Sequence, residues 1–296
     1  MDVLNALRIA KLTFREAVRR KALYGAIALT LAFLVLYAWG TGVAVAELDR
    51  EQATLGGINR VARQMNLDLR LVAIGELLLA GLFAVSNIGG LLAIFTAAGS
   101  IAQEVDQGTL QAVLAKPVSR WQIVVGKWLG GSAMLAVYTV VTSAATVAIV
   151  AWRAGYVPSN LLGGLALLVM RNTLLFSLTL VGSAVAPAIA TGIAMFIVFV
   201  VTNVAGMVEQ LGVAAEIQTM VRIGVISSIV VPNDALWKMA AAAVQPPNPL
   251  PALGLKMSLG PFGVVDPPSL AMGAYGVAYT LVALAVATAI FARRDL

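Results

Sequence analysis

The residue types that could do chemistry are few in this sequence, and two of the most versatile are missing. Its 296 residues include no histidine and no cysteine. The commonest general base, the commonest metal ligand and all thiolate chemistry are therefore excluded. The 14 acidic and 20 basic residues remain, and most of them lie between long apolar runs. We expect no catalytic residue and no metal site, and we expect the charged residues to position helices or contact partners.

The most informative polar segment is 103–127, which lies between two apolar runs. A narrow apolar helical face begins at Leu110, and Pro117 ends that helix because it lacks an N–H and restricts the residue before it. Ser119 and Gln122 then have the spacing of a capping box, which predicts the start of the next helix. We expect two helices and a sharp turn.

The start of the next apolar run carries residues suited to a membrane surface and to close packing. Lys127 and Trp128 suit the headgroup level, where the ammonium can snorkel and the indole stays half wet. Gly126 and Gly130 give the same helix a smooth face. We expect a tight helix contact on that face, and a dimer interface is one candidate.

Three polar residues lie in or near apolar runs, where an ionisable group costs a few kcal/mol unless it faces protein or water. Glu76 precedes the second run, and Arg171 and Asn172 interrupt the fourth. One interpretation is structural, with Arg171 paired to Glu76 or to backbone carbonyls. The other is a substrate path for an anionic group, such as a lipid phosphate, lined by all three residues.

The composition shows which elements must position these residues. Apolar residues make up 60% of the chain, charged residues only 11%, and the mean hydropathy is +0.92. Soluble domains average about 45–50% apolar and about 25% charged residues. The chain is therefore an integral membrane protein, and we predict an all-α polytopic fold in a single transmembrane domain. The six predicted spans are 22–46, 71–101, 124–152, 161–186, 188–208 and 269–291.

The distribution of charge predicts the orientation. Eleven Lys and Arg residues fall on the side of the two termini and eight on the other side, where eight acidic residues cancel them. Positive charge is retained on the cytoplasmic side of membrane proteins. We therefore expect both termini in the cytoplasm and the protein in the cytoplasmic (inner) membrane, and we attribute the net charge of +6 to orientation, not to nucleic-acid binding.

Two segments are predicted to be helical without spanning. Residues 1–21 place apolar and basic side chains on neighbouring stripes, as in a helix that lies in the membrane interface. The loop 209–268 is predicted to form an outer cap of short helices near the bilayer surface. An amphipathic helix is expected over 209–222, and a short helix capped by Asn233 or Asp234 is expected over 235–244. Seven of the eleven prolines fall in the second half of this loop.

The loop after the second span combines an acid, a G-T-L stretch, a P-V-S-R turn and a G-K pair. Its residues are Glu104, Gly108, Thr109, Leu110, Leu114, Lys116, Pro117, Val118, Ser119, Arg120, Gly126 and Lys127. In these residues it resembles the loop of type-two ATP-binding-cassette (ABC) exporter permeases, in which an E-x3-G-T-L stretch, a P-[VI]-[ST]-R turn and a G-K pair join the second and third of six helices. Arg15-Glu16 before the first span and the ending Arg293-Arg294-Asp295 are also similar. Within the family, the chain looks closest to the short permeases of nitrous-oxide-reductase maturation and of gliding systems.

The resemblance implies a cytoplasmic coupling helix that docks on a separate ATPase subunit. Glu104, Gly108, Thr109 and Leu110 would lie at or beside that contact. The remaining coupling residues, in and before the turn, would be Leu114, Lys116, Pro117 and Arg120. The implied assembly has two ATPase copies, which bind ATP and Mg²⁺, and a second permease copy or homologue. The permease itself would bind no cofactor and hydrolyse nothing.

The residues agree with that implication and leave alternatives open. Gly126-Lys127 would need a glycine at position 121 to form a phosphate-binding loop, and Trp121 stands there. A secondary transporter, an intramembrane lipid enzyme and a membrane anchor that recruits a cytoplasmic protein are the other hypotheses. The transported molecule is not encoded in the loop.

Overall fold

The computed structural model describes residues 2–54, 68–106, 119–247, 262–264 and 267–293, and over these ranges its only regular elements are helices. The predicted all-α class is confirmed. The helices are α1 (Asp2–Arg19), α2 (Lys21–Thr54), α4 (Leu69–Asp106), α6 (Arg120–Ala154), α7 (Leu161–Val185), α8 (Ala188–Ala214), α9 (Gln218–Val230), α10 (Asn233–Val244) and α11 (Leu270–Arg293).

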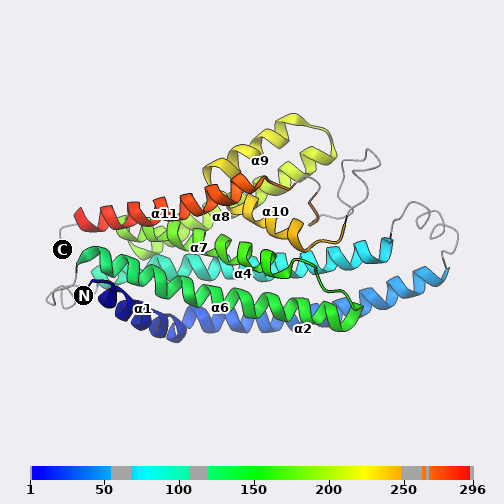
Figure 1. Ribbon diagram of the computed structural model, residues 1–296, viewed down its shortest axis with the longest axis horizontal. Helices are drawn as coiled ribbons and strands as arrows, with labels where there is room; N and C mark the ends of the chain where they lie inside the picture. Colours follow the sequence, from blue (N-terminus) through cyan, green and yellow to red (C-terminus); the bar gives the residue numbers. More distant parts are fainter. Residues whose placement is uncertain (1, 55–67, 107–118, 248–261, 265–266, 294–296) are drawn as a thin grey trace.

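Six helices are long and apolar enough to cross a bilayer, as expected: α2, α4, α6, α7, α8 and α11. They run side by side, and both termini lie at one end of the bundle (Figure 1). We call this the terminal end and the opposite one the distal end. The 38 residues of α4 extend for about 57 Å at 1.5 Å per residue, well beyond a hydrocarbon core of about 30 Å. Accordingly α2 and α4 project furthest at the distal end (Figure 1), where Arg70 pairs with Asp49 at 2.9 Å.

Helix α7 is central, since it packs against α4, α6, α10 and α11. Its buried face contributes Leu174, Leu175, Phe176 and Leu180 to the core. By contrast α2 packs on α4 and α6 and leaves most of its apolar side chains exposed. Dispersion and burial therefore hold α4, α6 and α7 together, while α2 presents a broad apolar surface to lipid or to another protein.

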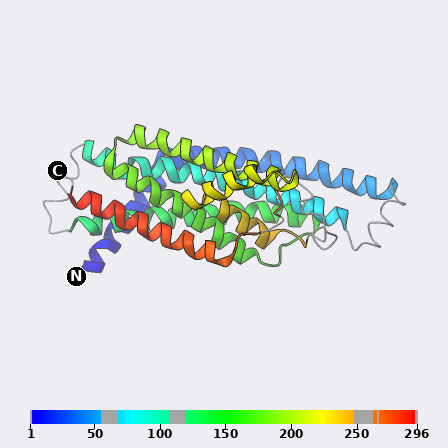
Figure 2. The same cartoon turned by 90° about the horizontal axis from the view of Figure 1, so that it is seen from above.

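Helix α1 lies obliquely beside α6 at the terminal end (Figure 2). The expected tight contact at the two glycines is present, and α1 makes it within the chain. A Cβ at Gly126 would lie 2.9 Å from the carbonyl oxygen of Ala6, and one at Gly130 would collide with that of Ala10. The basic side chains of α1 and also Leu7 and Leu12 stay exposed, as suits a helix in the membrane interface.

The predicted cap consists of a hairpin of two helices bent by 103° between α9 and α10. The bend lies at Val231 and Pro232, the residues between the two helices. The expected helix over 209–222 is wrong, because α8 continues to Ala214 and the chain reverses through Glu216, whose φ is 57°. Helix α9 then packs along α8.

Helix α10 corresponds to the helix expected over 235–244, but it is inserted in the bundle. Leu236 is fully buried and Trp237 is 3% exposed. The helix packs against α7, α8, α11 and α4. The hairpin therefore places polar residues of α10 beside the polar residues of α7.

Candidate functional site

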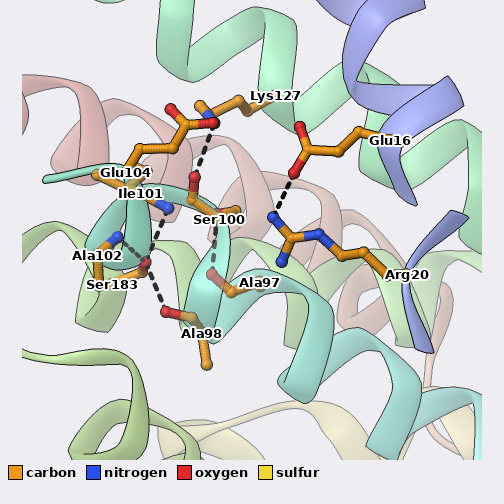
Figure 3. Close-up of polar contacts among 10 residues, drawn as sticks. All are labelled: Glu16, Arg20, Ala97, Ala98, Ser100, Ile101, Ala102, Glu104, Lys127 and Ser183. Atoms are coloured by element: carbon orange, nitrogen blue, oxygen red, sulfur yellow. Dashed lines mark hydrogen bonds and ion pairs between the residues drawn. The ribbon is translucent and has the colours of Figure 1, made fainter. Parts of the chain in front are cut away.

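The two helices that flank segment 107–118 are joined by an ion pair. Glu104 lies in the last turn of α4 and Lys127 in the third turn of α6. The Lys127 ammonium lies 2.6 Å from a Glu104 carboxylate oxygen and donates to the Ser100 carbonyl at 2.7 Å (Figure 3). Because the lysine is 4% exposed, water screens this pair far less than it screens a surface pair.

This geometry corrects the expectation for the start of the third span. Lys127 does not snorkel to the headgroups, because Glu104 and Ser100 supply its acceptors inside the protein. Trp128 also points inward, and its indole N–H donates to the Ser177 hydroxyl at 2.7 Å. No spacing rule links residues 23 positions apart, so the sequence did not indicate this pair.

Arg120, in the first turn of α6, fastens that helix to the end of α11. Its guanidinium donates to the carbonyl oxygens of Phe291 and Ala292 at 3.3 and 3.4 Å. Carbonyls in a last helical turn have no partner within the helix, and a cation near them is favourable. The capping box predicted at Ser119 is confirmed, since the Ser119 N–H donates to the Gln122 side chain at 3.1 Å.

A third contact joins α7 to α4 just before Glu104. The Ser183 hydroxyl donates to the Ala98 carbonyl at 2.9 Å and accepts from the N–H groups of Ile101 and Ala102 at 3.2 and 3.1 Å (Figure 3). An α-helix pairs the carbonyl of residue 98 directly with the N–H of residue 102. The buried hydroxyl therefore sits within the α4 hydrogen-bond ladder, where such insertions allow a helix to bend.

We call Glu104, Lys127, Arg120 and Ser183 the loop base. Of the predicted coupling residues, the structure brings Glu104 and Arg120 to the same end of the bundle, on either side of the loop. The other predicted coupling residues lie outside the described residues: Gly108, Thr109, Leu110, Leu114, Lys116 and Pro117.

The second candidate site surrounds Arg171, whose side chain is fully buried in α7. Its guanidinium donates to four side-chain oxygens from three other helices: Ser86 at 2.6 Å, Asn203 at 3.0 Å, Asn233 at 3.1 Å and Asn87 at 3.2 Å. The fork geometry of arginine suits several acceptors held in fixed positions. Arg171 therefore ties α4, α8 and α10 to α7.

Opposite charges lie next to this network. Asp234 follows Asn233 on α10, and Lys238 lies 2.8 Å from both Asp234 and Glu209 of α8. Two cations and two anions are thus grouped in this part of the bundle, so the cluster of Arg171, Lys238, Asp234 and Glu209 is formally neutral. Neutrality and pairing are what make buried charge tolerable in a low dielectric.

The expected pairing of Arg171 with Glu76 is wrong. Glu76 accepts from the backbone N–H of Phe262 at 3.1 Å. Along α4 it lies ten residues from Ser86, about 15 Å at 1.5 Å per residue. Glu76 thus attaches the segment 262–264 to α4. Arg171 instead donates hydrogen bonds to uncharged side chains that lie closer to its guanidinium.

Asn172 is also fully buried, and its hydrogen bond goes to α6, which supplies none of the acceptors of Arg171. Its amide donates to the Thr139 hydroxyl on α6 at 2.9 Å, while its carbonyl oxygen has no hydrogen-bond partner within the described part of the chain. The three residues proposed for a substrate path therefore make three separate sets of contacts, and Arg171 and Asn172 reach no surface in this conformation.

Comparison with known proteins agrees with this architecture. No curated protein matches the chain. The family described as ABC-2 family transporter protein matches residues 7–296, which include the six long helices, the loop base and the α9–α10 hairpin. The chain therefore belongs to the ABC-2 transporter family and is a multi-pass membrane permease of that family.

Proposed function

We propose that this chain is the permease subunit of an ATP-driven exporter in the cytoplasmic membrane, with both termini in the cytoplasm. A separate ATPase subunit, present in two copies, binds ATP and Mg²⁺ and docks on the loop 107–118. A second permease copy or homologue completes the membrane part. Within the family, we place the chain nearest the short permeases of nitrous-oxide-reductase maturation and gliding systems.

The observation that carries this proposal is the loop base. A protein that pushes on a loop moves the helices behind it only if the ends of the loop are held rigidly, since a mobile loop absorbs the displacement. The Lys127 and Glu104 pair joins the two helices at the ends of this loop. Motion of the loop would therefore move α4 and α6 together.

The loop base and the glycines of α6 connect the loop to three further helices. Arg120 holds the end of α11, Ser183 holds α7 to α4, and Gly126 and Gly130 hold α1 to α6. These contacts lie at the terminal end, which we expect to face the cytoplasm because of its excess of Lys and Arg. The proposed ATPase would therefore act on five helices through one loop.

The chain offers no nucleotide-binding site of its own at its single G-K pair. Trp121 occupies the position where a phosphate-binding loop needs glycine, and the lysine of the pair is held by Glu104 and the Ser100 carbonyl. This supports the proposal that ATP hydrolysis belongs to the partner.

A pull-down tests the proposal. The chain is purified from its native membrane in mild detergent, co-purified proteins are identified by mass spectrometry, and the eluate is assayed for ATPase activity. We expect a soluble protein with a phosphate-binding loop, and we expect it to be lost when residues 107–118 are replaced by a Gly/Ser linker of equal length. An eluate without such a protein would favour a secondary transporter or a membrane anchor instead.

The other proteins recovered in the same eluate test the subgroup. Accessory proteins of a metalloenzyme maturation or gliding system would support that placement, and partners of another system would contradict it while leaving the ATPase proposal intact.

A further inference from the structure

A groove of about 340 Å³ lies between α2 and α6 at the distal end, far from the loop base. Its lining on α2 follows one helical face, with spacings of three and four residues, and α6 contributes one arginine. The lining residues are Trp39, Gly42, Val43, Ala46, Glu47, Arg50 and Arg153.

This face of α2 changes from apolar to charged along its length. Trp39 and Val43 form the part nearer the bilayer centre. Glu47 and Arg50 form the outer part and lie about 12–17 Å from Trp39 along the helix, at 1.5 Å per residue. Trp39 is 70% exposed, and Trp152, beside the groove on α6, is 75% exposed. Exposed tryptophans gather where hydrocarbon meets headgroups, so the groove crosses this boundary.

Arg153 is held at the groove by an aromatic ring, and among the described residues it has no carboxylate partner. Its guanidinium stacks on the Trp152 ring at 4.3 Å and lies against Gly42, where a Cβ would come within 3.3 Å of the guanidinium carbon. In the described parts of the chain no carboxylate lies within ion-pair distance of it. Glu47 pairs with Arg50 at 3.3 Å, so the lining carries a net charge of +1.

We propose that this groove binds a phospholipid of the distal leaflet, with the lipid phosphate on Arg153 and one acyl chain along Trp39 and Val43. A guanidinium donates two parallel hydrogen bonds to a phosphate, and the single negative charge of a phosphodiester matches the single excess positive charge of the lining. The volume lies in the range of small-molecule sites, about 300–1,000 Å³. It accommodates a glycerophosphate and the start of the acyl chain that lies along Trp39 and Val43, while the rest of both tails remains in the bilayer.

Native mass spectrometry tests this site on the full chain in detergent with phosphatidylglycerol. We expect the wild type to retain the lipid and Arg153→Gln to bind it about tenfold more weakly, a loss of about 1.4 kcal/mol, because the substitution removes the charge-assisted contact with the phosphate. Arg222→Gln removes an exposed arginine from α9 and is the matched control, which should bind as the wild type does. Trp39→Ala should also weaken binding although no charge changes.

Three results would overturn the site. Equal retention of lipid by the wild type and Arg153→Gln would show that Arg153 does not hold the phosphate. Displacement of the lipid by millimolar inorganic phosphate would indicate an anion site without a lipid. A dimer that forms without lipid and is lost in both Arg153→Gln and Trp39→Ala would mean that a second copy of the chain fills the groove.

Discussion

At the scale of single residues, the Lys127 and Glu104 pair is the contact on which the loop base depends most. Lys127→Met keeps most of the side-chain length and removes the ammonium, which leaves the Glu104 carboxylate and the Ser100 carbonyl without this donor. We expect a loss of about 2–3 kcal/mol in the free energy of unfolding, measured as a lower thermal midpoint of the purified protein.

The matched control is Glu16→Gln. Glu16 pairs with Arg20 at the same distance, 2.6 Å, but its side chain is 48% exposed, so the pair contributes about 0–1 kcal/mol. Figure 3 shows both pairs. Equal destabilisation by the two variants would contradict the role assigned to burial.

Both the charge and the fork-shaped guanidinium of Arg171 should contribute to the stability of the fold. Arg171→Gln removes a buried cation from a neutral cluster, with an expected cost of about 3–5 kcal/mol. Arg171→Lys keeps the charge, but one ammonium cannot reach the four acceptors on α4, α8 and α10. We expect both variants to melt at lower temperature than Arg222→Gln. A lysine variant as stable as the wild type would refute the bridging role.

Residue types and short spacings revealed some of these sites and missed others. The capping box at Ser119 and the buried position of Arg171 follow from local pattern and hydropathy. The hydrogen-bond partners of Arg171 could not be predicted in this way, because Asn233 lies 62 residues away and only the bent hairpin brings it close. Glu76 lies next to an apolar run in the sequence, which made it a plausible but wrong partner.

At the scale of helices, the close contact of α1 with α6 should depend on the absence of a side chain at Gly130. Gly130→Leu would place a side chain where the Ala10 carbonyl lies, so α1 should detach. Because the chain lacks cysteine, Ala6→Cys gives a probe that is 4% exposed in the packed helix. We expect maleimide to label it rapidly only when Gly130→Leu is also present.

Gly25→Leu is the control for that experiment. Gly25 lies on α2, and no atom lies within 4 Å of the Cβ it would gain. We expect the Ala6→Cys probe to stay protected in this background. Labelling that rises equally in both backgrounds would show that the effect is general destabilisation and not the loss of one helix contact.

Hydropathy predicted the six long helices because each carries an apolar run of bilayer length. It did not predict how α10 packs, since a helix of 12 residues is too short to span and its polar residues suggest a surface location. In the structure, Asp234 and Lys238 belong to the same charged cluster as Arg171, and both are buried. The position of α10 therefore depends on its ion pairs and hydrogen bonds with α7 and α8, which hydropathy does not indicate.

At the scale of the whole molecule, the charge asymmetry predicts which end faces the cytoplasm. Val157→Cys lies between α6 and α7 at the distal end and is 60% exposed, and Arg293→Cys is exposed at the end of α11. In intact cells we expect a membrane-impermeant maleimide to label only Val157→Cys, and to label Arg293→Cys after permeabilisation. Labelling of Arg293→Cys but not of Val157→Cys in intact cells would show the opposite topology. The loop base would then lie on the side of the membrane away from the cytoplasm, where the proposed ATPase could not reach it.

The most direct test of the central claim is the ATP hydrolysis rate of the partner ATPase in proteoliposomes. The rate is measured without permease and with the wild-type, Glu104→Gln or Glu16→Gln chain, and bound ATPase is quantified in each case. We predict that the wild type and Glu16→Gln change the rate by the same factor, while Glu104→Gln binds the ATPase without reproducing that change. A Glu104→Gln chain that regulates hydrolysis as the wild type does would contradict coupling through the loop base.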